Sequence, residues 1–212
     1  MLFLDILSLF HGLLHLFPFF KGWGVSLKRR ETAARARNEG GNSMLNEFSR
    51  TQLLLGPEAM AKLAESRVAV FGIGGVGGYT VEALARSGIG ALDLIDDDKV
   101  CLTNINRQIF ALLSTIGKYK VDVAEARIHD INRHCTVTKY QQFYLPENAD
   151  KIDVTQFDYV VDCIDTVKAK LELIRRCHRA HVPIICCMGA ANKLDATAFR
   201  VADIERTSVD PL

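Results

Sequence analysis

Apolar residues along the chain form short continuous runs that alternate with longer amphipathic stretches. Runs such as VAVF at 68–71 and YVVDC at 159–163 are typical of parallel strands that are buried on both faces. The pattern predicts strands at 67–72, 91–96, 136–141, 158–163, 183–187 and 197–202, and helices at 48–55, 57–64, 76–87, 106–113, 118–134 and 167–181. Strands that alternate with helices predict an α/β fold, a Rossmann-like doubly wound and mainly parallel sheet with helices on both faces.

The first 43 residues differ in character from the rest of the chain. Residues 1–20 are strongly apolar, cations follow at positions 21–30, and the remainder up to residue 43 is polar. Four residues interrupt the apolar run, namely Asp5, His11, His15 and Pro18. Three interpretations stay open: an extension upstream of a start at Met44, a membrane or targeting segment, or a part of the fold. We expect one globular domain at 44–212 in a cytoplasmic protein, with membrane association added if the apolar segment inserts.

Composition and charge restrict the partners. Apolar residues make up 49% of the chain, and the formal net charge is +1. Residues 1–43 hold six of the 26 Lys and Arg and three of the 25 Asp and Glu, so the globular part has a net charge of −2. A nucleic acid would therefore meet a local patch and not a field over the whole domain. A solvated face is the favoured interpretation of the cationic helix at 167–181, and contact with a nucleic-acid backbone is the alternative.

The six cysteines form no C-x-x-C pair, so we expect no zinc site. Several lie in apolar strands, where free cysteine acts as a small core residue. We expect a reducing compartment without structural disulfides.

A glycine-rich turn follows the first buried strand. Gly72, Gly74 and Gly77 form G-x-G-x-x-G, with Gly75 as an additional glycine. The turn lies between a predicted strand and a predicted helix, and Asp96 ends the next strand at the spacing that a ribose requires. The pattern predicts a bound nucleotide, with its phosphates at the helix N-terminus. A purely structural glycine turn is the alternative.

Charged residues follow this turn in a consistent order. Two predicted strands end in acidic residues, at 96–98 and at 162–165. One carboxylate could bind ribose hydroxyls and another a magnesium ion. For Asp165, capping of the helix that follows is the alternative. Arg107 offers a fixed cationic fork for a phosphate that gains charge in a transition state. Lys120 begins a helix against its dipole, which indicates an anion nearby. A nicotinamide dehydrogenase is disfavoured, because Arg107, Lys120 and Asp165 would have no function in one.

Five motifs in order carry a resemblance to a known family: GIGGVG, LIDDDKV, N-x-N-R-Q, G-x-x-K and D-x-x-D. The chain from Met44 to Leu212 resembles the adenylating domain of the ubiquitin-activating-enzyme-like superfamily, so the resemblance implies ATP and Mg²⁺ as ligands. It implies that the glycines contact the ATP phosphates, that Asp96 binds the ribose and that Asp165 holds Mg²⁺. It assigns the triphosphate site to Asp98, Asn104, Arg107 and Gln108, with Lys120 as a phosphate contact. Arg50 resembles an arginine that one subunit donates to the ATP of its partner, which implies a homodimer.

Within this superfamily three features look most like the branch that dehydrates threonylcarbamoyladenosine in tRNA. These are FSRTQLLLG before the first strand, Thr166 after Asp165, and the DPL sequence at 210–212. The resemblance implies a ligase-type enzyme that adenylates the carboxylate of the modified base and cyclises it with release of AMP. It also implies that relatives continue beyond DPL, so we expect a truncated C-terminus. Two alternatives remain: an activating enzyme for a ubiquitin-like sulfur carrier, with sulfur-transfer partner proteins, and a nucleotide-binding homologue without catalysis.

Overall fold

The structure, a computed structural model, describes residues 45–189, 195, 197 and 199–208 of the 212-residue chain. The chain divides into two units, residues 1–61 and 62–212. Helix α3 (Ser49–Leu55) belongs to the first unit, and helix α4 (Pro57–Glu65) runs across the boundary in the sequence. The segment 1–43 lies outside the described residues, so its three interpretations stay open. Within the described ranges, no helix combines the length and the apolar character that crossing a membrane requires.

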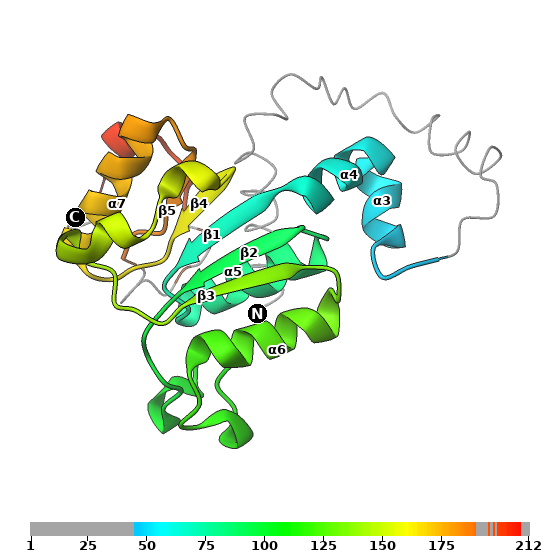
Figure 1. The fold of residues 1–212 in the computed structure, drawn as a ribbon, viewed down its shortest axis with the longest axis horizontal. Coiled ribbons are helices and arrows are strands. Elements are labelled where there is room, and N and C mark those ends of the chain that lie inside the picture. The colour runs from blue at the N-terminus through cyan, green and yellow to red at the C-terminus, as the bar shows by residue number, and fades with distance from the viewer. Residues whose placement is uncertain (1–44, 190–194, 196, 198, 209–212) are drawn as a thin grey trace. The chain divides into compact units, whose positions relative to one another are not determined.

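The second unit is built on a five-stranded sheet in which every strand is parallel to its neighbours (Figure 1). The strand order is β3-β2-β1-β4-β5. The strands are β1 (Arg67–Phe71), β2 (Ala91–Ile95), β3 (Thr136–Tyr140), β4 (Tyr159–Asp162) and β5 (Ile184–Cys186). In β1 and β2 every residue after the first is buried, and β4 is buried throughout, as the continuous apolar runs predict. The doubly wound α/β prediction is confirmed.

Helices cover both faces of the sheet. Helices α5 (Gly75–Arg86) and α6 (Lys120–Ile131) connect strands in one direction from β1, and α7 (Val167–Ala180) connects strands in the other. Right-handed crossovers therefore place α7 on the opposite face from α5 and α6. Glu82 joins the first two helices, because its carboxylate accepts hydrogen bonds from Arg86 of α5 and from Arg127 of α6.

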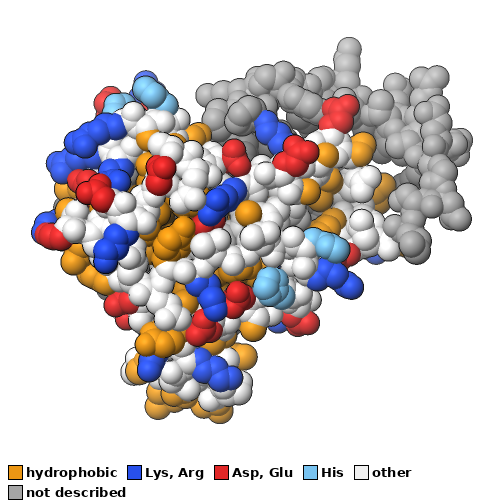
Figure 2. Space-filling model, in the orientation of Figure 1, with side chains coloured by type: hydrophobic (Ala, Val, Ile, Leu, Met, Phe, Trp, Pro, Cys, Tyr) orange, Lys and Arg blue, Asp and Glu red, His pale blue; other side chains and the backbone are white. Residues whose placement is uncertain are grey.

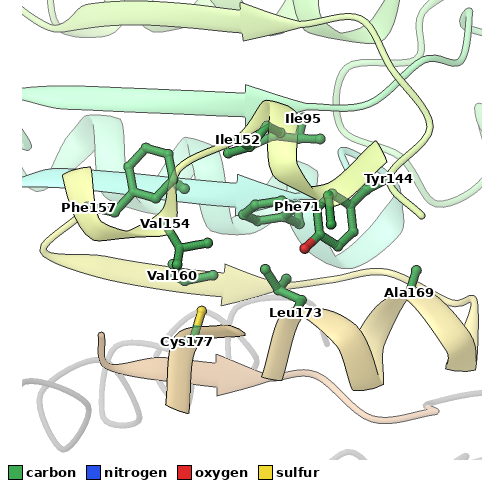
Figure 3. Close-up of a cluster of buried hydrophobic side chains, with 12 residues drawn as sticks. Phe71, Ile95, Tyr144, Ile152, Val154, Phe157, Val160, Ala169, Leu173 and Cys177 are labelled. Atoms are coloured by element: carbon green, nitrogen blue, oxygen red, sulfur yellow. The ribbon is translucent and has the colours of Figure 1, made fainter. Parts of the chain in front are cut away.

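The face under α7 holds a cluster of buried apolar side chains (Figure 3). Phe71 at the end of β1 meets the ring of Tyr144 edge-on, with 5.0 Å between the ring centroids. Leu173 of α7 is fully buried in the same cluster. Burying one such large side chain contributes about 1.5–3 kcal/mol. Two short 3₁₀ helices, η4 (Pro146–Lys151) and η5 (Val154–Gln156), contribute further buried residues.

The predicted helix at 106–113 is wrong. This segment consists of turns between two short 3₁₀ helices, η2 (Leu102–Asn104) and η3 (Leu113–Thr115). The side chain of Thr115 takes backbone groups that a helix would use: its hydroxyl oxygen accepts from the N–H of Leu112, and the hydroxyl donates to the carbonyl of Phe110. Such local bonds compete with helix formation.

The predicted strand at 197–202 is also wrong in its described residues, which form no strand. Asp195 accepts hydrogen bonds from both the N–H and the hydroxyl of Thr197. Asp203 accepts from the N–H of Glu205 at the start of η7 (Ile204–Arg206). These aspartates bend the backbone locally, so the β-type composition of the intervening residues does not decide their conformation.

Candidate nucleotide-binding site at the carboxyl edge of the sheet

The carboxyl ends of three strands meet at one edge of the sheet. Phe71, the last residue of β1, is in register with the last residues of both β2 and β4. The glycine turn from Gly72, the acidic segment from Asp96 and the segment that leads to Asp165 therefore leave the sheet next to one another. In open parallel sheets, ligands bind beyond this edge. The structure thus brings together three of the segments that the sequence selects.

Two glycines fix the geometry of the turn, and two others leave room beside it. Gly72 has a φ of 88°, which side chains rarely adopt. A Cβ on Gly77 would lie 1.8 Å from the carbonyl oxygen of Gly72, so only glycine lets α5 pack this closely. A Cβ on Gly74 or Gly75 would make only ordinary contacts, at 3.8 Å from Gln108 and 3.6 Å from Arg107. Gly74 is the N-cap of α5 and no side chain caps it, so the first N–H groups of the helix are available to an anion.

Asp96 ties the acidic segment to the glycine turn. One oxygen of its carboxylate accepts from the N–H of Ile73 at 2.7 Å, and the other accepts from the N–H of Asp98 at 2.8 Å. Burial raises the pKa of Asp96, and the Ile73 N–H and the charge of Lys120 oppose this shift. The carboxylate is therefore fixed in orientation beside the turn. Its predicted contact with the ribose stays a prediction.

Lys120 lies between two of the predicted site carboxylates. It is the first residue of α6, two residues after the predicted start of this helix at residue 118, and its side chain is only 6% exposed. Its Nζ is 2.5 Å from Asp98 Oδ2 and 3.7 Å from Asp96 Oδ1. The Asp98 side chain is 66% exposed. The buried Lys120 amine is thus held by the carboxylate of Asp98, which is itself accessible to water.

The loop after β2 also lies next to the glycine turn. The Cγ atom of Arg107 is 3.6 Å from the position of a Cβ on Gly75, and Nε2 of Gln108 is 3.8 Å from the position of a Cβ on Gly74. Arg107 is exposed and donates to the carbonyl of Thr103. Both residues therefore lie beside the glycines at ordinary contact distance.

Asn104 supports this loop from within. Its backbone carbonyl accepts from the N–H groups of Arg107 and Gln108, at 3.1 Å and 2.9 Å. Its side-chain oxygen accepts from the N–H of Cys101 at 3.0 Å. These bonds assign Asn104 a part in shaping the loop; its predicted contact with the triphosphate stays a prediction.

Asp165 offers an exposed carboxylate at the end of the third segment. Thr166 is the N-cap of α7, and no side chain caps that helix, so helix capping does not account for Asp165. The Thr166 hydroxyl donates to Asp165 at 3.5 Å, and no cation of the described residues pairs with this carboxylate. An unpaired carboxylate is the oxygen donor that Mg²⁺ prefers, so the residue fits the ion that the resemblance implies. Carboxylate oxygens of residues 96–98 also lie within 4.8 Å of one another.

Arg50 cannot be placed at this site. It is an exposed residue of α3 and belongs to the first unit. Its predicted role concerns the ATP site of a second copy, so it stays a prediction.

Several cations of helix α7 form ion pairs and do not make up a free basic patch. Three of its cations pair with carboxylates: Lys168 with Glu147, Arg176 with Asp150 at 2.6 Å, and Lys170 with Asp162 at 2.6 Å. Acidic and basic side chains also stand next to one another over the face shown in Figure 2. Among the described residues, Arg175 and Arg179 are the exposed cations of this helix without an ion pair.

The buried pair of Lys170 and Asp162 was missed by sequence reasoning. The two side chains are 3% and 0% exposed, so the prediction of a solvated or RNA-facing Lys170 is wrong. Lys170 also donates to the carbonyl of Cys187 at 3.1 Å, and Asp162 accepts from the N–H of Ile164. Two signals could have revealed it. Asp162 ends an apolar run, where a charge requires a partner, and Lys170 shares the apolar stripe of α7 with Ala169 and Leu173.

Comparisons with known proteins agree with this geometry. The model of the ThiF family matches residues 48–207. The chain is 48% identical over 169 residues to tRNA threonylcarbamoyladenosine dehydratase of Bacillus subtilis (strain 168), which covers 80% of this chain and 66% of that protein. It is 43% identical to the protein of the same name from Escherichia coli (strain K12), which covers 78% of this chain and 62% of that protein. The chain thus spans less than two thirds of the length of these curated relatives.

A solved structure shares the fold. The crystal structure of E. coli tRNA N6-threonylcarbamoyladenosine dehydratase in complex with ATP aligns with a TM-score of 0.76 at 43% identity. The alignment covers 78% of this chain and 68% of that one. A protein with a similar fold and a closely related sequence therefore binds ATP.

Proposed function

The chain belongs to the ThiF family, and from this premise we propose that it is an ATP-dependent dehydratase of threonylcarbamoyladenosine in tRNA. The observation that carries the proposal is the 43–48% identity to bacterial enzymes of that name over about four fifths of this chain. The match to the ThiF family model, over residues 48–207, includes the strands, the glycine turn and the loop that form the candidate site. ATP bound to the E. coli relative supports a nucleotide at this edge of the sheet.

The glycine turn and Asp96 would hold the nucleotide. The phosphates would lie against the open side of Gly74 and Gly75 at the start of α5, where N–H groups and the helix dipole favour negative charge. Asp96 would accept hydrogen bonds from the ribose hydroxyls. Its bonds to the N–H groups of Ile73 and Asp98 fix the carboxylate in advance, which reduces the entropy lost on binding.

The reaction would begin by activating a carboxylate. Attack by the threonylcarbamoyl carboxylate on the α-phosphorus of ATP breaks the bond to pyrophosphate and forms an acyl-adenylate. A carbamoyl atom then attacks the acyl carbon and closes a ring, and AMP leaves. The balance is loss of water from the modified base, with ATP converted to AMP and pyrophosphate. This route requires no protein nucleophile.

Arg107 and Lys120 would stabilise the charge that moves onto the phosphates. Such preorganised cations act in the transition state without further rearrangement. Lys120 would exchange the exposed carboxylate of Asp98 for a phosphate oxygen, and Gln108 would contribute an amide donor beside the glycines. Asp165 would hold Mg²⁺, which when bound neutralises phosphate charge.

We also propose that two copies of the chain form a homodimer in which Arg50 of one copy reaches the ATP of the other. The segment 102–116 exposes several apolar side chains next to the candidate site: Leu102, Leu112, Leu113 and Ile116. Contiguous apolar surface of this kind marks interaction sites. Sedimentation of the chain beside a Leu113→Asp variant tests the dimer, which should dissociate in the variant.

Pyrophosphate release tests the proposed reaction. The chain is incubated with ATP, Mg²⁺ and tRNA that carries, or lacks, the threonylcarbamoyl group. Release that depends on the modified tRNA supports the proposal. Release that instead depends on a protein ending in Gly-Gly would replace it with activation of a sulfur carrier, and ATP binding without release would indicate a nucleotide-binding homologue.

A further inference from the structure

Two cysteine thiols meet beneath the glycine turn. Asp162 of β4 is in register with Cys186 of β5, and Cys163 and Cys187 continue that register by one residue. Cys163 Sγ donates to Cys187 Sγ across 3.9 Å. Both residues are partly exposed, and both are free thiols. Neither has a part in the proposed reaction.

The backbone geometry suits a disulfide between them. Neighbouring strands lie about 4.8 Å apart, and the Cα atoms of disulfide-bonded cysteines are usually about 4.4–6.8 Å apart. Bonding would bring the two sulfurs about 2 Å closer than they are, since the S–S bond length is about 2.05 Å. The other cysteines are less suitable partners. Cys186 follows the alternation of a strand and points to the opposite face of the sheet. Cys135 and Cys177 are buried, and Cys101 is exposed and distant in the sequence.

Cys163 is in direct contact with the glycine turn. Its carbonyl oxygen is 2.7 Å from the position of a Cβ on Gly72, and its own Cβ is 3.3 Å from the position of a Cβ on Gly77. Its N–H also donates to the carbonyl of Phe71 at 2.8 Å. Because Cys163 packs against Gly72 and Gly77 and is hydrogen-bonded to Phe71, a shift of Cys163 toward β5 would change the packing that supports the glycine turn.

We propose that Cys163 and Cys187 are a redox modification site, at which a reversible disulfide displaces the glycine turn and weakens nucleotide binding. With glutathione disulfide as oxidant, one cysteine sulfur attacks it and one glutathione leaves. The other cysteine sulfur then attacks the mixed disulfide, and the second glutathione leaves. Two protein thiols are oxidised to one disulfide, and one glutathione disulfide is reduced to two glutathione thiols.

The disulfide is tested on the full chain without nucleotide. After treatment with glutathione disulfide, thiol titration should show the loss of two of the six thiols, and peptide mass spectrometry should identify the Cys163–Cys187 link. Dithiothreitol should reverse the change. The link should be absent in Cys163→Ser and in Cys187→Ser, whereas the matched variant Cys186→Ser should retain it. Because either serine variant should abolish the link, a folding defect in one of them leaves the other as the test.

Two measurements test whether the disulfide displaces the glycine turn. Hydrogen exchange of the peptide that spans residues 72–78 should become faster in the oxidised chain and unchanged in Cys187→Ser. The dissociation constant of ATP should rise by at least about tenfold, because a displaced turn no longer presents preorganised N–H groups to the phosphates; this second readout rests on the proposed function.

Three results would overturn the inference: no link between these cysteines, a link that leaves hydrogen exchange of the turn unchanged, or a response that persists in Cys187→Ser. Failure of the reduced chain to bind ATP would instead overturn the proposed function. The thiol count and hydrogen exchange would still decide the redox site in that case.

Discussion

Replacement of Lys170 by methionine is the sharpest test of the structure, because it separates a buried ion pair from a surface cation. Lys170 and Asp162 are almost fully buried, and 2.6 Å separates Lys170 Nζ from Asp162 Oδ2. Methionine keeps the unbranched shape and most of the length of the side chain, and it removes the charge. Asp162 would keep the N–H of Ile164 as a donor but would lose its counter-ion, and the carbonyl of Cys187 would lose a donor.

The expected loss of stability follows from this burial. Removal of one partner from a buried ion pair costs about 3–5 kcal/mol, because it leaves an uncompensated charge. The matched control is Lys168→Met on the same helix, where the paired side chains of Lys168 and Glu147 are 63% and 61% exposed. An exposed pair of this kind contributes about 0–1 kcal/mol. The double variant Asp162→Asn with Lys170→Met removes both charges and should recover most of the loss.

Urea unfolding followed by circular dichroism measures these differences. With an m-value of about 2 kcal/mol/M, Lys170→Met should lower the midpoint by about 1.5–2.5 M, and Lys168→Met by less than about 0.5 M. Equal midpoints for the two methionine variants would refute the buried pair. Failure of the double variant to regain stability would show that lost packing, and not an isolated charge, causes the defect.

Other substitutions test the site and its support. Gly77→Ala should prevent stable folding, because its Cβ would lie 1.8 Å from the carbonyl oxygen of Gly72. Gly75→Ala should fold with a normal melting temperature, because its Cβ would make only ordinary contacts with Arg107, but it should lose ATP affinity in calorimetry, since the methyl group would stand where the phosphates are proposed to lie. Arg107→Ala should slow tRNA-dependent pyrophosphate release by about 100–1000-fold without a change in melting temperature, and an unchanged rate would exclude Arg107 from the reaction. Burial raises the pKa of Glu82, but hydrogen bonds from two arginines outweigh it and leave the pKa below 4.5. Its stabilising effect is therefore complete above about pH 4.5 and is lost as the pH falls through the lower folded-state value, so Glu82→Gln should flatten the acid decline of the melting temperature.

The sheet could be predicted from the sequence because its strands are buried on both faces. Runs such as Val68–Phe71 admit few other interpretations, and the glycine turn marks where the first strand ends. The prediction failed where side chains bond to the nearby backbone. At Thr115 and Asp195 these bonds outweigh helical or strand-like composition, and periodicity does not reveal them.

The candidate site shows a similar division. The order of motifs selects Asp96 and Lys120, and parallel strands must bring their ends together, so their proximity was predictable. The contact between Cys163 and Cys187 was not, because it depends on which strands are neighbours, and the six thiols look alike in the sequence. The burial of Lys170 depends likewise on the face that α7 turns to the sheet.

Two lysines at this edge of the sheet have similar contacts and opposite consequences. Lys120 and Lys170 are both buried amines, and each lies about 2.5–2.6 Å from a carboxylate oxygen. The difference lies in the partner. Asp98 is 66% exposed, so it regains water if a phosphate takes its lysine, and the exchange costs little. Asp162 is fully buried, so loss of its lysine would strand a charge. The exposure of the carboxylate therefore separates a lysine that can be released to a ligand from one that holds the fold.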